Sequence, residues 1–248
     1  MIRYLLVWIF TLSIGGYAMA QPAQATTEIS APFSQNDLYE AFNRKMFAFN
    51  LALHHSVGKP IVTAYDALPS PMRTGIRNFV THLGTPLTVV HDLLQGKGEK
   101  AVTDFMRFVI NTVFGLGGTL DIATEAGMHY QPEDLGQTLY AWGLWDEASF
   151  LMLPVLGPYT TREAVGGAVD AWADPVYTAI LNANGNVKLA LRTLDGIDRY
   201  AQVQPFLDQL NEQPDPYIFV RESYLQHRMG LLYDGQPPQP DIDDIDLE

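Results

Sequence analysis

The chain has 248 residues, enough for one domain with a sizeable core. Its 28 acidic and 15 basic side chains give a formal net charge of −13, which excludes the basic footprint of a nucleic-acid-binding protein and disfavours simple adsorption to anionic lipid headgroups. Cysteine is absent, so disulfides, thiolate metal sites, cysteine nucleophiles and an acylated cysteine near the N-terminus are excluded.

The first 25 residues have the pattern of a secretory signal peptide. Arg3 supplies the positive start, residues 4–14 the apolar core, and residues 18–20 (A-M-A) or 23–25 (A-Q-A) the small-residue cleavage site. An uncleaved membrane anchor is the alternative, but the apolar core is shorter than the roughly 20 residues of a spanning helix. We therefore expect an exported protein whose signal peptide is cleaved.

Beyond the signal peptide, the composition predicts three segments. Residues 26–35 are expected to form a flexible linker, and residues 36–233 one helical domain. Residues 234–248 are rich in proline and acidic side chains, five of which lie among the last eight residues. This composition predicts a disordered, solvated tail, and an acidic docking strip for a basic partner is the alternative.

The first predicted helix, which begins near Asn36, has two apolar faces. One narrow stripe along it contains Leu38, Phe42, Met46, Phe49 and Leu53. Phe47 and Leu51 lie on the opposite side, although an ordinary surface helix needs only one apolar contact. Either both faces pack in the protein core or one of them meets lipid, and the residues alone leave both interpretations open. The predicted membrane-interface residues are Leu38, Phe42, Met46, Phe47, Phe49 and Leu53.

Proline and glycine divide the rest of the chain into short predicted helices. Four pairs are interpreted as a helix stop followed by a helix start: Gly58 with Pro60, Ser70 with Pro71, Gly84 with Pro86, and Asp174 with Pro175. Further helices are predicted over residues 97–114, 161–173, 187–210 and 216–232. No sustained alternation of apolar and polar residues predicts a strand. The predicted fold class is all-α, with irregular backbone at residues 115–118 and 150–159.

The helix predicted over residues 97–114 carries one thin polar line. Lys100, Asp104, Arg107 and Asn111 share a stripe about 60° wide, and apolar side chains cover most of the remaining circumference. One interpretation is a buried helix whose charged residues pair with one another at i+3 and i+4 spacing. The other is that the line faces a water-filled passage and meets lipid headgroups.

Two arginines on the helix that opens at Pro71 are a second candidate site. Arg73 and Arg77 lie four residues apart, so forked hydrogen bonds from both guanidinium groups to one phosphate are possible. The alternative is two solvated arginines whose aliphatic stems cover the core face of the helix.

The sequence lacks three common catalytic or phosphate-binding motifs. The sequence contains no G-x-S-x-G nucleophile turn, no H-E-x-x-H and no phosphate-cradling G-x-x-x-x-G-K. Its six histidines lack the spacing of metal ligands. We therefore predict a protein that is not an enzyme and that has no metal and no cofactor.

Seven blocks of the sequence, in one order, resemble the MlaA/VacJ family. The family opens with a pattern close to N-D-P-L-E-x-F-N-R-x-M-F-x-F-N. The blocks here are N-D-L-Y-E-A-F-N-R-K-M-F-A-F-N at 36–50, P-x-x-x-R-T-G-I-R-N-F at 69–79, H-D-L-L-Q-G at 91–96, R-F-V-I-N-T-V-F-G-L-G-G at 107–118, D-L-G-Q-T-L-x-x-W-G at 134–143, L-P-V-L-G-P at 153–158, and D-P-Y at 215–217. The lipobox cysteine typical of the family is missing, so attachment to a membrane would have to come from the folded body.

The resemblance implies a fold and a function. The implied fold is a ring-like helical domain with a helical hairpin beside an amphipathic channel. The implied function is the removal of misplaced phospholipids from the outer leaflet of the outer membrane, with a porin trimer and the periplasmic Mla lipid-binding protein as partners. A soluble periplasmic module that binds lipid or acts as a scaffold is the alternative.

Overall fold

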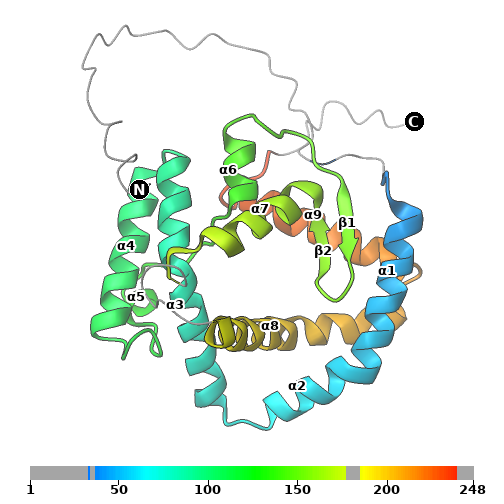
Figure 1. Cartoon of the computed structure of the whole chain (residues 1–248), viewed down its shortest axis with the longest axis horizontal. Coiled ribbons are helices and arrows are strands. Elements are labelled where there is room, and N and C mark those ends of the chain that lie inside the picture. Colours follow the sequence, from blue (N-terminus) through cyan, green and yellow to red (C-terminus); the bar gives the residue numbers. More distant parts are fainter. Residues whose placement is uncertain (1–32, 34–36, 177–184, 239–248) are drawn as a thin grey trace, which may run out of the picture. The chain divides into compact units, whose positions relative to one another are not determined.

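The structure is a computed structural model that describes Phe33 and residues 37–176 and 185–238 (Figure 1). The predicted signal peptide and the tail beyond residue 238 lie outside the described residues, as does the predicted linker apart from Phe33. The ring-like arrangement and the channel stay predictions.

The fold is almost entirely helical, which confirms the predicted class. The helices are α1 (Glu40–Leu53), the π-helix η1 (His54–Gly58), α2 (Lys59–Asp66), α3 (Ser70–Leu94), α4 (Gly98–Val113), α5 (Ile122–Glu125), α6 (Leu135–Ala141), α7 (Thr161–Ala173), α8 (Gly185–Asp208), the 3-10 helix η3 (Gln209–Glu212) and α9 (Pro216–Leu232). Four of them, α4, α7, α8 and α9, confirm the helices predicted over 97–114, 161–173, 187–210 and 216–232.

Side-chain caps define where four of these helices begin, and the cap of α5 is Asp121, whose side chain accepts from the Thr124 amide. Asp134 accepts a hydrogen bond from the Gln137 amide at the start of α6, and Thr160 accepts one from the Glu163 amide at the start of α7. At the start of α9 the carboxylate of Asp215 accepts from two backbone amides. Each such cap is worth roughly 1 kcal/mol, because it satisfies amides that have no partner inside the helix.

Two of the predicted breaks between helices are wrong. At Gly58 the chain passes from α1 through the π-helix into α2 without a turn, and a Cβ on Gly58 would collide with the Tyr200 hydroxyl. At Pro86 α3 continues from Ser70 to Leu94. Proline removes one helical hydrogen bond, and packing of α3 against α4 and α8 offsets that loss. The predicted helix start at Ser70 and stop before Pro175 are confirmed.

The prediction of irregular backbone at 150–159 is also wrong. Strands β1 (Phe150–Leu153) and β2 (Gly157–Thr160) form an antiparallel hairpin in which Phe150 faces Thr160 and Leu153 faces Gly157. The strands have only four residues each, too few for a periodic pattern to be recognised. The tip holds Val155 at a φ of +70°, a left-handed conformation that is unusual for a β-branched residue.

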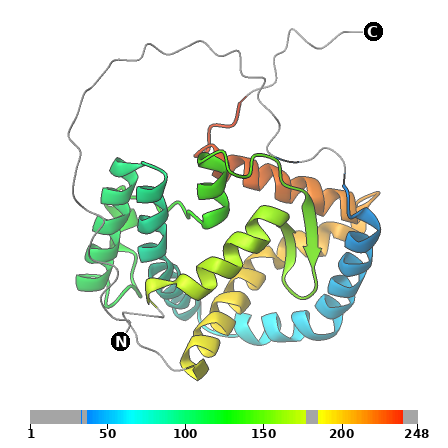
Figure 2. The ribbon, with the colours of Figure 1, turned by 45° about the horizontal axis from the view of Figure 1, so that its top comes forward.

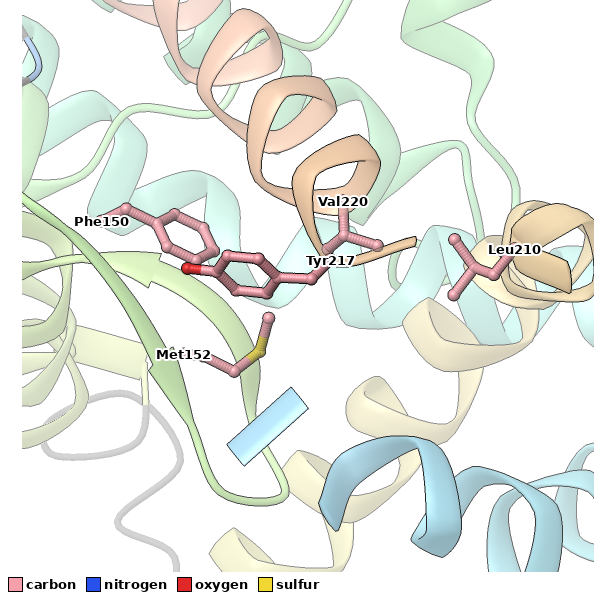
Figure 3. Close-up of a cluster of buried hydrophobic side chains, with 5 residues drawn as sticks. All are labelled: Phe150, Met152, Leu210, Tyr217 and Val220. Carbon is pink, nitrogen blue, oxygen red and sulfur yellow. The ribbon is translucent and has the colours of Figure 1, made fainter. Parts of the chain in front are cut away.

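The first and last helices meet the hairpin in an apolar cluster. Figure 3 shows Phe150 and Met152 of β1 beside Tyr217 of α9, with Leu210 and Val220 also in the cluster. The Phe150 and Tyr217 rings meet edge to face with centroids 6.1 Å apart. Side chains of α1 that pack against this cluster are Met46, Phe47 and Leu51.

An ion pair joins the same two helices across 171 residues of sequence. The Arg44 guanidinium donates to Asp215 Oδ2 at 2.9 Å and lies 4.5 Å from the centroid of the Tyr217 ring. The hydrogen bond from Arg44 holds the pKa of Asp215 below its usual value. The D-P-Y block at 215–217 is therefore a docking point for the first helix.

Helices α3 and α4 lie side by side, and α8 contacts both α2 and α3, as Figures 1 and 2 show. Within the described ranges, no helix combines the length and the apolar character that crossing a membrane requires.

Candidate functional site

Helix α4 has its polar side inside and its apolar side outside. Its buried residues are Ala101, Asp104, Arg107 and Asn111. On the opposite side Val102 is 64% exposed and Phe105 is 53% exposed. This orientation is the reverse of the one expected for a helix at a water-facing surface.

The same reversal extends over the neighbouring segments. In the described part of the chain, twenty polar or charged residues are buried against fourteen hydrophobic ones, although burial of apolar side chains normally drives folding in water. Large apolar side chains are exposed instead. On α3, α4 and the following loop these are Met72, Val90, Leu93, Leu94, Val102, Phe105, Met106, Val113, Phe114, Leu116 and Leu120.

The predicted polar line pairs mainly with residues outside α4. Arg107 donates to both oxygens of Asp121 at 3.2 Å and to Thr124 Oγ1 at 3.0 Å. Asn111 donates to Asp121 at 2.9 Å and accepts from the Ala123 amide at 3.0 Å. Although burial opposes it, hydrogen bonds from Thr124 and Asn111 hold the pKa of Asp121 below its usual value.

At the other end of the line, Lys100 contacts carboxylates from distant segments. Its Nζ donates to Glu133 at 2.5 Å and to Asp234 at 2.9 Å. Lys97 donates to the same two carboxylates at 2.9 and 2.8 Å. The Lys100 side chain remains 25% exposed, which makes it the most accessible of the four predicted residues.

The structure divides the six predicted membrane-interface residues, of which Leu38 lies in the turn before α1 and the others in α1, between two environments. Leu38 is 67% exposed, and Phe42 and Phe49 are also exposed. Met46 and Phe47 pack against the apolar cluster, and Leu53 is half-buried. One face of α1 is therefore core, and the other is uncovered in this structure.

Two residues that the sequence analysis missed fix α1 to the hairpin. Asn43, fully buried, donates to the Phe150 carbonyl at 3.1 Å and accepts from the Met152 amide at 2.8 Å. Asn50, two helical turns later, makes the same pair of hydrogen bonds to β1 and the hairpin tip. Each amide thus pairs with backbone as another strand would. The sequence does contain a signal for this contact: Asn43 and Asn50 are seven residues apart, a spacing that places both side chains on one face of a helix.

The two arginines at the start of α3 are each paired within the protein. Arg73 donates to Asp66 at 2.6 Å. Arg77 contacts the buried carboxylate of Asp198 at 3.3 and 3.4 Å, and the Tyr65 hydroxyl donates to the same carboxylate at 2.8 Å. A phosphate bound by either arginine would have to compete with these carboxylates.

A second buried network, also missed, connects α6, α7 and α9. Arg228 donates to Asp134 at 2.8 Å and to Glu163 at 3.0 Å. Neighbouring Arg162 is fully buried and lies 4.9 Å from the centroid of the Tyr140 ring. Burial lowers the pKa of Arg162. Single residues of this kind give no sequence signal, because each partner is tens of residues away.

Comparison with known proteins finds one family and several relatives that are similar to most of this chain. The model of the MlaA lipoprotein family matches residues 35–230. The intermembrane phospholipid transport system lipoprotein MlaA of Shigella flexneri is 32% identical over 229 residues, which cover 86% of this chain and 89% of that protein. The protein of the same name from Haemophilus influenzae is 31% identical over 208 residues, covering 82% of this chain and 81% of that protein.

A solved structure is also similar. It is described as "Structural basis for maintenance of bacterial outer membrane lipid asymmetry" and matches with a TM-score of 0.70 at 31% identity. The match covers 80% of this chain and 100% of the solved one.

Proposed function

Because this chain belongs to the MlaA lipoprotein family, we propose that it transports phospholipid at the outer membrane and so maintains lipid asymmetry. In this proposal it removes misplaced phospholipid from the outer leaflet without any covalent step. A periplasmic lipid-binding protein of the Mla system receives the lipid, and a porin trimer holds the protein in place.

The observation that carries the proposal is the inverted helix α4 with its neighbour α3. Burying one large apolar side chain is worth roughly 1.5 to 3 kcal/mol relative to leaving it in water. A surface that exposes Leu93, Val102, Phe105 and Phe114 together is therefore costly in water and favourable in hydrocarbon. With no cysteine available for an acyl chain, this surface and the exposed side of α1 would hold the protein at the membrane.

The passage for lipid is the finer part of the proposal. Lys100, Asp104, Arg107 and Asn111, together with Arg73 and Arg77, are proposed to line or support it. Lys100 is the candidate for headgroup contact, because its side chain is 25% exposed. Arg107 and Asn111 are buried among protein groups and would act as its support.

Retention in the membrane separates this proposal from the soluble-module alternative. We expect the mature protein to remain in the outer-membrane fraction after a carbonate wash and after a high-salt wash. Recovery of the protein in the wash supernatant would favour a soluble periplasmic module.

Cysteine labelling then locates the lipid-facing surface in intact outer membranes. The chain has no native cysteine, so single substitutions are read without background. Val102→Cys and Phe105→Cys are expected to react with an apolar maleimide but not with a polar thiol reagent, whereas the control Glu125→Cys reacts with both. Reaction of all three with the polar reagent would contradict a lipid-facing α4.

Lys100→Cys tests the passage in the same membranes. Reaction with a small polar thiol reagent is expected if this position faces water inside the membrane-held protein. If Lys100→Cys does not react with the polar reagent while Glu125→Cys does, Lys100 does not face a water-filled passage.

A further inference from the structure

Two carboxyl groups meet between α3 and α4. Asp92, near the end of α3, is fully buried, and Asp104 of α4 is 2% exposed. The two carboxyls are close enough to hydrogen-bond to each other. In the described part of the chain, no donor hydrogen-bonds to either oxygen of Asp92 or to Oδ1 of Asp104. Two ionised carboxylates have no hydrogen to share, so a hydrogen bond between these two groups forms only when one of them is protonated.

The surrounding charges do not neutralise two ionised carboxylates. Lys100 Nζ lies 3.9 Å from Asp92 Oδ1, and Arg107 Nε lies 3.8 Å from Asp104 Oδ1. Both cations make shorter contacts elsewhere, to Glu133 and Asp121 respectively.

Further acidic groups lie near the pair, and the nearby Lys97 pairs with Glu133 and Asp234 at 2.9 and 2.8 Å. Glu133, from the segment before α6, adds a third negative charge, and Tyr130 of the same segment also faces Asp104. Asp234, after α9, competes for Lys100.

We propose that Asp92 and Asp104 share one proton and that loss of this proton, as pH rises to neutrality, weakens the contact between α3 and α4. The released proton passes to solvent and leaves two adjacent buried negative charges, which repel each other. The inference concerns the response of the fold to pH, and it stands whether or not α4 faces lipid.

The difference in pKa between the folded and the unfolded chain determines how stability changes with pH. Burial, opposed by Lys100 and reinforced by Asp104, raises the pKa of Asp92 from 3.8 to about 7. Burial also raises the pKa of Asp104. The folded protein therefore keeps a proton that the unfolded chain releases above about pH 4, so this contribution to stability is complete below that pH and is lost as pH rises through 7.

The test compares the pH dependence of unfolding for the full-length protein in detergent, between pH 5 and 8.5. Asp92→Asn replaces the proton-sharing group by an amide that can donate to Asp104 and does not titrate. Relative to this variant, the unfolding constant of the wild type is expected to rise by about tenfold per pH unit between pH 5 and 7 and to level off by pH 8. The surface control Glu125→Gln should keep the wild-type slope. A wild-type slope that Asp92→Asn also shows would overturn the proposal.

Infrared spectroscopy gives a second reading that needs no variant to fold. The wild type at pH 5.5 should show the carbonyl band of a protonated, buried carboxyl group, and this band should disappear by pH 8.5. The variants Asp92→Asn and Asp104→Asn should both lack this pH-dependent band. Absence of any such band from the wild type would overturn the shared proton directly.

Discussion

The side chain of Asn50 holds the backbone of Val155 in a left-handed turn. The Val155 amide donates to Asn50 Oδ1 at 2.7 Å, and the Asn50 side chain returns a hydrogen bond to the Leu153 carbonyl at 2.8 Å. The hairpin tip and α1 are thereby fixed to each other, although 105 residues separate Asn50 from Val155. The strain of the φ at Val155 persists because these hydrogen bonds hold it.

Replacing Asn50 by alanine is expected to destabilise the protein by roughly 1–3 kcal/mol, because the change removes two hydrogen bonds and leaves their backbone partners unsatisfied. Chemical denaturation of the purified protein measures the loss. Lys45→Ala, an exposed change on the same helix, should stay within about 0.5 kcal/mol of the wild type. Equal stability of both variants would show that the hairpin holds its position without Asn50.

Deleting Ala48 and Phe49 should separate α1 from the hairpin. The deletion turns the downstream helix by about 200°, so Asn43 and Asn50 no longer lie on one face. We expect Asn43 to keep its contacts and Asn50 to lose them. In the proposed function, a passage held shut by this packing would then leak, and cells would become sensitive to bile salts even beside a wild-type copy. A recessive phenotype would show that α1 only stabilises the fold.

Asp198 should be among the most sensitive positions of the chain. Its buried carboxylate accepts hydrogen bonds from Tyr65, Arg77 and Gln202, and so joins α2, α3 and α8. Asp198→Ala leaves the Tyr65 hydroxyl without its partner, while Arg77 is 46% exposed and can be solvated, so the change should cost roughly 2–3 kcal/mol of stability. Tyr65→Phe removes one donor and should cost about 1 kcal/mol. A similar loss in both variants, measured by denaturation, would contradict this ranking.

The Tyr65 hydroxyl offers a related test by pH titration. Burial, together with the hydrogen bond to Asp198, raises the pKa of Tyr65 to about 12. The contribution of Tyr65 to stability is therefore complete below pH 10 and lost as pH rises through 12. Ultraviolet difference spectra of the wild type against Tyr65→Phe should show one phenol that ionises late. Ionisation near pH 10 would contradict its burial against Asp198.

Two adjacent glycines allow a matched comparison in the loop after α4. Gly117 and Gly118 both have positive φ, and a Cβ at Gly117 meets nothing within 4 Å, whereas one at Gly118 would collide with the His82 ring. Gly117→Ala should therefore cost roughly 1–2 kcal/mol for the backbone conformation alone. Gly118→Ala should cost clearly more, as thermal unfolding would reveal. Equal costs would mean that His82 moves aside freely.

Local signals predicted those helices whose ends depend on nearby residues. The Asp174-Pro175 stop lies next to the end of α7, and the predicted bounds of this helix, 161–173, are those observed. The continuation of α3 past Pro86 depends on packing against α4 and α8, which no local pattern reports. The hairpin was missed for a similar reason, because its edge is paired by asparagines more than 100 residues away.

In the candidate site too, features set by nearby residues were predictable and contacts with distant segments were not. The amphipathic pattern of residues 97–114 predicted which side of α4 is polar and which is apolar, and the buried residues of α4 agree with it. Asp104 and Arg107 also lie close to each other. The partners of that polar side could not be predicted, because Asp121, Glu133 and Asp234 reach it from three separate segments.

The bond between Arg44 and Asp215 also bears on the order in which the protein folds. Contacts between residues 171 positions apart form late, since the chain between them must first be brought together. If the chain is exported across a membrane from its N-terminus, as its first residues predict, α1 is exported before α9 and cannot pack against it until α9 has followed. The apolar side of α1 that packs on the cluster would stay uncovered throughout that interval. Periplasmic chaperones that bind extended apolar segments would then find their target at the N-terminal end of the newly exported chain.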